Sequence, residues 1–137
     1  MTKRWFLARL LAAGDNAVNQ KVLQAIVEPM DVELEIVGDG AQAVEAWRTG
    51  EYDVILMDIQ MPVMDGISAA RAIRDAERKQ KRPRTPILAL TANALTHQVE
   101  EYMAAGMDGH VSKPIEIGKL YDALSRVLAG AQASEAA

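Results

Sequence analysis

Short apolar runs alternate with helical patterns along this 137-residue chain. The apolar runs lie at residues 8–13, 32–37, 53–57, 86–90 and 110–112, and helical spacing of apolar residues follows at 18–26, 41–49, 67–77, 95–105 and 116–128. Parallel strands need crossover connections, so repeated strand–helix units are typical of an open parallel sheet covered on both faces. The pattern therefore predicts an α/β fold with a doubly wound, five-stranded parallel sheet.

Capping and breaking residues mark the expected helix ends. Asn16 is a candidate N-cap of the first helix, and Pro29 is expected to stop it. Gly106 is expected to end the fourth helix and Gly130 the fifth, which leaves a small, polar segment behind. We therefore expect a domain at 8–129, an N-terminal extension at 1–7 and a flexible tail or linker stub at 130–137.

The N-terminal segment has two interpretations. Lys3 and Arg4 precede the apolar run 5–13 in the manner of a signal peptide. Arg9 interrupts that run, and no stretch approaches the roughly 18 uninterrupted apolar residues of a membrane span. A first strand is the favoured interpretation, and a signal peptide is the alternative.

Composition and charge exclude several kinds of function. The chain has no cysteine, which excludes disulfides, thiolate metal sites and a cysteine nucleophile, and a cytoplasmic location is expected. The net charge of −4 offers no general attraction for nucleic acid or anionic membranes. Residues 71–84 carry seven basic and two acidic residues, which fits a solvated helix end and loop or a binding site for an acidic partner or nucleic acid.

Polar residues follow four of the predicted strands. Asp15 follows the first strand, Asp58 the third, Thr91 the fourth and Lys113 the fifth. Ligands of doubly wound sheets bind beyond the carboxyl ends of the strands, so these side chains are expected to meet in one crevice. Two carboxylates, a hydroxyl and an ammonium are the groups needed to form an aspartyl phosphate with a metal ion, although each alone is also a common cap or surface residue.

Five motifs in these regions resemble one family. They are D-N-A-V-N-Q at 15–20, I-L-M-D-I-Q-M-P-V-M-D-G at 55–66, A-L-T-A-N-A at 89–94, A-G-M-D at 105–108 and S-K-P at 112–114. In their order and spacing, residues 8–129 resemble the receiver domain of bacterial two-component response regulators, either single-domain or from a hybrid histidine kinase. The resemblance implies a flavodoxin-like (βα)5 sheet with strand order 2-1-3-4-5.

The resemblance also implies a phosphoacceptor site. Asp58 would take a phosphoryl group from a phosphohistidine of a histidine kinase or histidine phosphotransfer protein. Mg²⁺ would be held by Asp15, Asp58 and the backbone carbonyl of Gln60. The other phosphoryl-binding groups would be Thr91, Lys113 and the backbone N–H groups of Gln60 and Ala92.

Further residues are implied to tune or transmit the signal. Thr91 and His110 would form the switch, although the family usually has Tyr or Phe where this chain has His110. Gln60 and Asn93 would tune the lifetime of the phosphorylated state. The Lys113–Pro114 bond is implied to be cis, whereas a trans bond is the base-rate expectation.

Gly14 is the second departure from the family, because an acidic residue usually stands there. Weaker Mg²⁺ binding is expected, and a pseudo-receiver that binds partners without phosphate is the alternative function. A phosphatase of the haloacid dehalogenase kind is disfavoured because Gln60 stands where that family has a second Asp. We expect a signalling module and not an enzyme. Its output is expected to pass to a protein partner through the helix, strand and helix at 95–105, 110–112 and 116–128.

Overall fold

The computed structural model describes residues 8–30, 32–92 and 95–136. In this part of the chain, five parallel strands form one sheet in the order β2-β1-β3-β4-β5. The elements are β1 (Arg9–Ala13), α2 (Ala17–Val27), a 3₁₀ turn η1 (Glu28–Met30), β2 (Glu33–Val37), α3 (Gly40–Thr49), β3 (Val54–Asp58), α4 (Gly66–Gln80), β4 (Ile87–Thr91), α5 (Thr96–Ala104), β5 (Gly109–Ser112) and α6 (Ile117–Ala136). The predicted fold class and strand order are confirmed.

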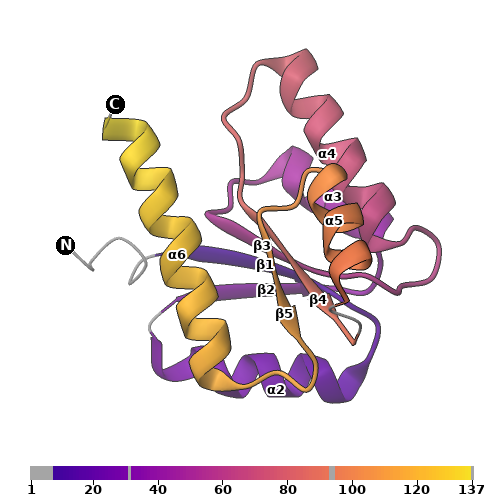
Figure 1. The fold of residues 1–137 in the computed structure, drawn as a ribbon, viewed down its shortest axis with the longest axis vertical. Coiled ribbons are helices and arrows are strands. Elements are labelled where there is room, and N and C mark those ends of the chain that lie inside the picture. The colour runs from indigo at the N-terminus through magenta and orange to yellow at the C-terminus, as the bar shows by residue number, and fades with distance from the viewer. Residues whose placement is uncertain (1–7, 31, 93–94, 137) are drawn as a thin grey trace.

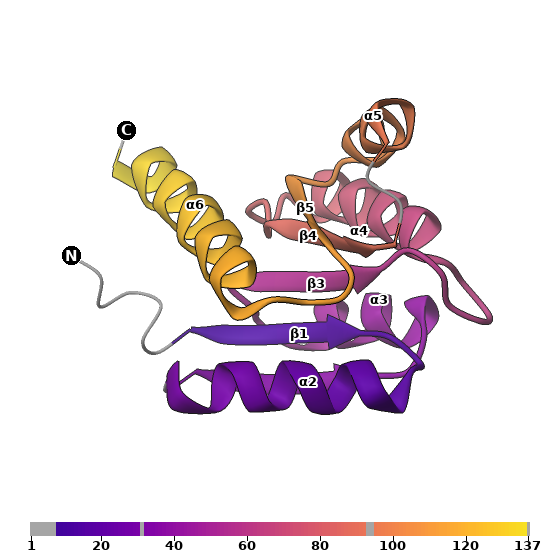
Figure 2. The same cartoon turned by 60° about the horizontal axis from the view of Figure 1, so that its bottom comes forward.

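Helices cover both faces of the sheet, α2 and α6 on one side and α3, α4 and α5 on the other (Figure 1, Figure 2). Successive residues of a strand point to opposite faces. Leu10 and Ala12 of β1 accordingly pack with α2 and α6, while Leu11 and Ala13 join the core under α3 and α4. Both cores are mainly aliphatic, and none of the helices in the described ranges is long and apolar enough to cross a membrane.

Side-chain caps fix where the helices begin. The Asn16 side chain accepts from the Asn19 N–H over 3.0 Å and starts α2, as predicted. Asp65 caps α4 in the same way through the Ser68 N–H at 2.7 Å. The helix α2 ends at Val27, directly before the 3₁₀ turn that contains Pro29.

One predicted helix end is wrong. Helix α6 continues through Gly130 to Ala136, whereas the sequence pattern placed its end at Gly130. A glycine inside a helix costs only about 1 kcal/mol relative to alanine, and the alanines that follow Gly130 favour the helix. Gly106, in contrast, follows the end of α5 with φ 102°, the left-handed conformation that glycine adopts easily.

A buried ion-pair cluster ties α4 to the amino end of β4 and to the loop before β5. The Arg74 guanidinium donates to Glu77 Oε1 at 2.9 Å, to Asp108 Oδ2 at 2.9 Å, and to the carbonyl oxygens of Thr85 and Gly106 at 2.8 Å each. Arg74 and Glu77 are each 5% exposed. Burial lowers the pKa of Arg74, and the charge of Glu77 opposes that shift, so the cation depends on its partners.

The same contacts bear on the basic segment 71–84. Four of its arginines make contacts inside this chain: Arg74 in the buried cluster, Arg78 with Asp75, Arg84 with Asp108, and Arg82 with backbone carbonyls. Much of the local positive charge therefore has a structural use. This supports the solvated helix end and loop over a binding site for nucleic acid.

We predict that Arg74→Met lowers the free energy of unfolding by about 3 kcal/mol, because it leaves the Glu77 carboxylate buried without its cation. Arg78→Met is the matched control on the same helix. Arg78 pairs with Asp75 at an exposed site, so its loss should lower the free energy of unfolding by under about 0.5 kcal/mol. Urea unfolding measures both values. A loss below about 1 kcal/mol for Arg74→Met would contradict the role given to this cluster.

Candidate functional site

The topology brings three of the predicted site residues to one edge of the sheet. Asp58 is the last residue of β3 and Thr91 the last of β4, and the register pairs Asp58 with Leu90. The Lys113 N–H, just beyond β5, donates to the carbonyl oxygen of Thr91 over 2.8 Å. Because these strands are parallel, their carboxyl ends meet, as expected for a doubly wound sheet.

The Asp58 carboxylate is buried and has a partner at each oxygen. Lys113 Nζ lies 2.7 Å from Oδ2, and the Gln60 N–H donates to Oδ1 over 3.1 Å. The residue is only 4% exposed, and a carboxylate is stable at such a site only when it is paired. The Lys113–Pro114 peptide bond is cis, as the resemblance implied.

Gly66 allows the chain to turn back against the backbone of Asp58. A Cβ atom at Gly66 would lie 2.2 Å from the backbone oxygen of Asp58, so no larger residue fits without a shift of the backbone. The Gly66 N–H donates to the carbonyl oxygen of Ile59 over 3.1 Å and closes the loop between β3 and α4. The Asp65–Gly66 pair therefore starts α4 and also fixes the loop next to Asp58.

A cavity of about 130 Å³ opens beside the ion pair. Its walls include the predicted residues Asp58, Gln60, Thr91, Ala92 and Lys113, and α5 adds Gln98, Glu101 and Tyr102. The volume is several times that of one water molecule, so a small polyatomic group fits there. Asn93, predicted to tune the site, lies outside the described residues.

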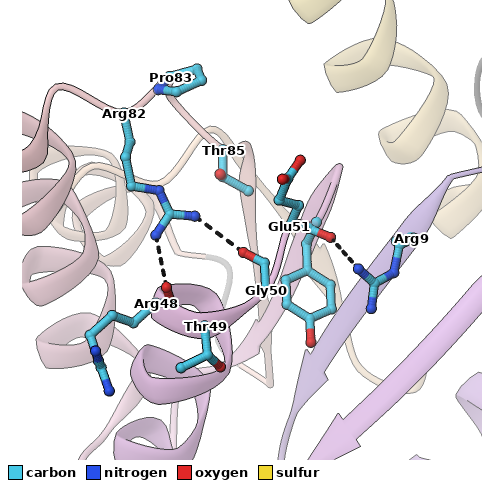
Figure 3. A pocket seen from close by; sticks show the side chains of 9 residues that line it. Arg9, Arg48, Thr49, Gly50, Glu51, Arg82, Pro83 and Thr85 are labelled. Carbon is cyan, nitrogen blue, oxygen red and sulfur yellow. Dashed lines mark hydrogen bonds between the residues drawn. The ribbon is translucent and has the colours of Figure 1, made fainter.

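A larger cavity, of about 830 Å³, lies near the amino ends of β1 and β4, away from the carboxyl ends of the strands (Figure 3). One of its cations, Arg82, donates to the backbone oxygens of Trp47, Arg48 and Gly50, and its guanidinium carbon lies 3.9 Å from the centroid of the Trp47 ring. These contacts close the carboxyl end of α3, which explains the cation without a ligand. Since ligands of this fold class bind at the carboxyl ends of the strands, the smaller cavity is the candidate site.

The oxygen donors at this edge suit magnesium. Asp15, whose side chain is exposed, follows Gly14 at the end of β1, and a Cβ atom at Gly14 would lie 3.4 Å from Asp58 Oδ2. Asp15 and Asp58, with the Gln60 carbonyl, would offer only oxygen ligands, which Mg²⁺ prefers together with several waters. Nowhere in the described ranges do three acidic or histidine side chains gather as a metal cluster. The residue types thus suit the ion, with one carboxylate fewer than the family pattern.

The aromatic partner of Thr91 is a residue that sequence reasoning missed. The Tyr102 hydroxyl lies 2.9 Å from Thr91 Oγ1, and both side chains are 3% exposed. His110, the residue predicted for this part of the switch, has an exposed side chain on the edge strand β5, while the next residue, Val111, faces the core. The helical pattern of 95–105 could have placed Tyr102 on the buried side of its helix. It could not have shown which strand residue the ring contacts.

Comparison with known proteins agrees with this architecture. A family model described as the response regulator receiver domain matches residues 10–125. The signal transduction histidine-protein kinase BarA of Escherichia coli K12 is 40% identical over 121 residues, which cover 88% of this chain and 13% of BarA. The chain thus spans a small part of the length of this relative.

Two solved structures are similar in fold. The receiver domain of the sensor histidine kinase PA1611 of Pseudomonas aeruginosa PAO1, solved with magnesium in its active site cleft, is 40% identical with a TM-score of 0.80, over 90% of this chain and 98% of that one. The receiver domain of Saccharomyces cerevisiae Ssk1, in complex with the phosphotransfer protein Ypd1, is 28% identical with a TM-score of 0.78, over 84% of each chain. By its fold, the residues at its carboxyl edge and these matches, the chain belongs to the response regulator receiver domain family of two-component signal transduction.

Proposed function

We propose that residues 8–129 are the phosphoacceptor unit of a histidine–aspartate phosphorelay, with Asp58 as the acceptor. The observation that carries this proposal is the buried Asp58 carboxylate held 2.7 Å from Lys113 Nζ at the mouth of a small polar cavity. An acceptor carboxylate needs a nearby cation, because transfer brings the negatively charged oxygens of a phosphoryl group to this site. Lys113 supplies that cation.

The transfer step balances without an added base. A carboxylate oxygen of Asp58 attacks phosphorus and the new P–O bond forms. The P–N bond of the donor phosphohistidine breaks, its electron pair goes to the ring nitrogen, and the ring, which carries a proton on its other nitrogen, leaves as neutral imidazole. Lys113 Nζ, which donates to Asp58 Oδ2 before transfer, would then pair with a phosphoryl oxygen instead. Thr91, Gln60 and Ala92 line the same cavity, and the threonine hydroxyl and the backbone N–H groups of Gln60 and Ala92 would be the further donors.

Asp15, Asp58 and the Gln60 carbonyl would hold Mg²⁺. When bound, the ion supplies positive charge that neutralises phosphoryl oxygens during transfer. Gln60, whose side chain is exposed at the cavity, and Asn93 would tune the lifetime of the phosphorylated state. Gln60 also occupies the position where an aspartyl-phosphate phosphatase would need a second acid, so a signalling role is favoured over turnover of a substrate.

Two surfaces are proposed for partners. Val18 on α2 is 69% exposed beside the carboxyl edge of the sheet, which suits docking of a histidine kinase or phosphotransfer protein, and the Ssk1 complex with Ypd1 is a precedent. Leu95 and Met103, at 59% and 48% exposed, belong to the α5–β5–α6 face proposed for a downstream protein. We place this exchange in the cytoplasm, and no nucleic acid is expected to take part.

We predict that acetyl phosphate with Mg²⁺ gives the chain one hydroxylamine-labile phosphoryl adduct, and that Asp58→Asn abolishes it because the amide is not a nucleophile. Intact mass spectrometry measures the adduct. Asp75→Asn is the matched control, since Asp75 is exposed on α4 and pairs only with Arg78 among the contacts described. Absence of an adduct at saturating Mg²⁺ would instead favour the pseudo-receiver.

We also predict that Gly14→Asp tightens Mg²⁺ binding by about 1–2 kcal/mol, or roughly 5- to 30-fold, because it restores a carboxylate next to Asp58. The space beside Gly14 accepts a Cβ atom at ordinary contact distance, so the variant should fold. Calorimetric titration of the unphosphorylated protein measures the dissociation constant. Gln80→Glu is the control. It adds the same charge at the far end of α4, about 20 Å of helix away, and should leave the dissociation constant for Mg²⁺ unchanged.

A further inference from the structure

The hydroxyl groups of Thr91 and Tyr102 form a buried link between β4 and α5. They lie 2.9 Å apart, and Tyr102 is one of three α5 residues that line the cavity beside Asp58. We infer that Tyr102 is a positioning residue for the Thr91 hydroxyl and the route by which phosphorylation of Asp58 reaches α5. This inference rests on the proposed function, because it assigns a partner to a group of that same site.

The direction of the Thr91–Tyr102 hydrogen bond follows from the number of protons available. A threonine hydroxyl donates one hydrogen bond and accepts two. In the proposed phosphorylated state, Thr91 must donate to a phosphoryl oxygen, so it cannot also donate to Tyr102. Tyr102 must then be the donor in that state, so that its proton points to a lone pair of Thr91 Oγ1 and the threonine proton points to the phosphoryl oxygen.

The position of Tyr102 also determines what moves. The tyrosine is 3% exposed on the nine-residue helix α5, whose first turn has no side-chain cap at Leu95. Within the part of the chain that the structure describes, Gln98 Oε1, on the same wall of the cavity, is buried with no hydrogen-bond partner. A buried acceptor without a partner is unfavourable, so the packing of α5 against this cavity leaves room for a better arrangement. If Thr91 shifts toward the phosphoryl group, the hydrogen bond to Tyr102 would pull α5 in the same direction.

The exposed His110 does not offer this connection. Its side chain lies on the surface of the edge strand β5, whereas the Tyr102 hydroxyl is already within hydrogen-bond distance of Thr91. The aromatic group next to the threonine thus comes from a helix and not from β5. The element expected to respond first to phosphorylation is therefore α5.

Tyr102→Phe tests the inference, because it removes the hydroxyl and keeps the ring. Tyr52→Phe is the matched control, since the Tyr52 hydroxyl donates to Glu35 over 2.8 Å at the other end of the sheet. We expect Tyr102→Phe to slow adduct formation from acetyl phosphate by about two- to tenfold, the effect of one neutral hydrogen bond, and Tyr52→Phe to leave it unchanged. In a Thr91→Val background, Tyr102→Phe should have no further effect.

A second readout follows the helix itself. The amide resonances of α5 should shift when the wild-type chain is phosphorylated, and the shifts should shrink in Tyr102→Phe. An unchanged or faster rate in Tyr102→Phe, an equal slowing in the Thr91→Val background, or an undiminished α5 response would each overturn the inference while the adduct on Asp58 still supports the proposed function. A wild-type chain without any adduct would overturn both.

Discussion

The ion pair between the Asp58 carboxylate and the Lys113 ammonium is the contact around which the carboxyl edge of this protein is organised. A carboxylate that is 4% exposed would be strongly destabilising without a cation, and removing one partner of such a pair typically costs about 3–5 kcal/mol. The cation comes from another strand end at the same edge, because β3 ends at Asp58 and Lys113 directly follows β5. The loop of 59–65 then closes over the pair through Gly66 and the Gln60 N–H.

Stability and chemistry occupy different ends of the sheet. Arg74 and Arg82 donate their hydrogen bonds to carboxylates and carbonyl oxygens near the amino ends of β3 and β4, where they hold α3 and α4 in place. The carboxyl edge keeps its cation, Lys113, beside a cavity. Because the two sets of charges are separate, the proposed phosphorylation would change the charge of the carboxyl edge without disturbing the contacts that hold the fold together.

The departures from the family pattern act in two different ways. Gly14 changes the electrostatics of the site, because a carboxylate is missing beside Asp58 while the space for it remains. His110 changes the packing, because a polar ring on an edge strand stays in solvent and a buried tyrosine from α5 contacts Thr91 instead. Under the proposed function, the first would affect how strongly Mg²⁺ is held, and the second would affect which element responds to a movement of Thr91.

Apolar periodicity alone determined the five strands, to within one or two residues at most ends, and with them the carboxyl-edge positions of Asp58, Thr91 and Lys113. It did so because strand and helix periods are local properties of the chain. The end of α6 was also open to the sequence, because the alanines after Gly130 favour a helix and a glycine costs it only about 1 kcal/mol. Only the tertiary structure decided that Tyr102 meets Thr91 and that Arg74 joins Glu77 to Asp108. These two contacts depend on which side chains pack together across different elements, and a pattern along the chain does not contain that information.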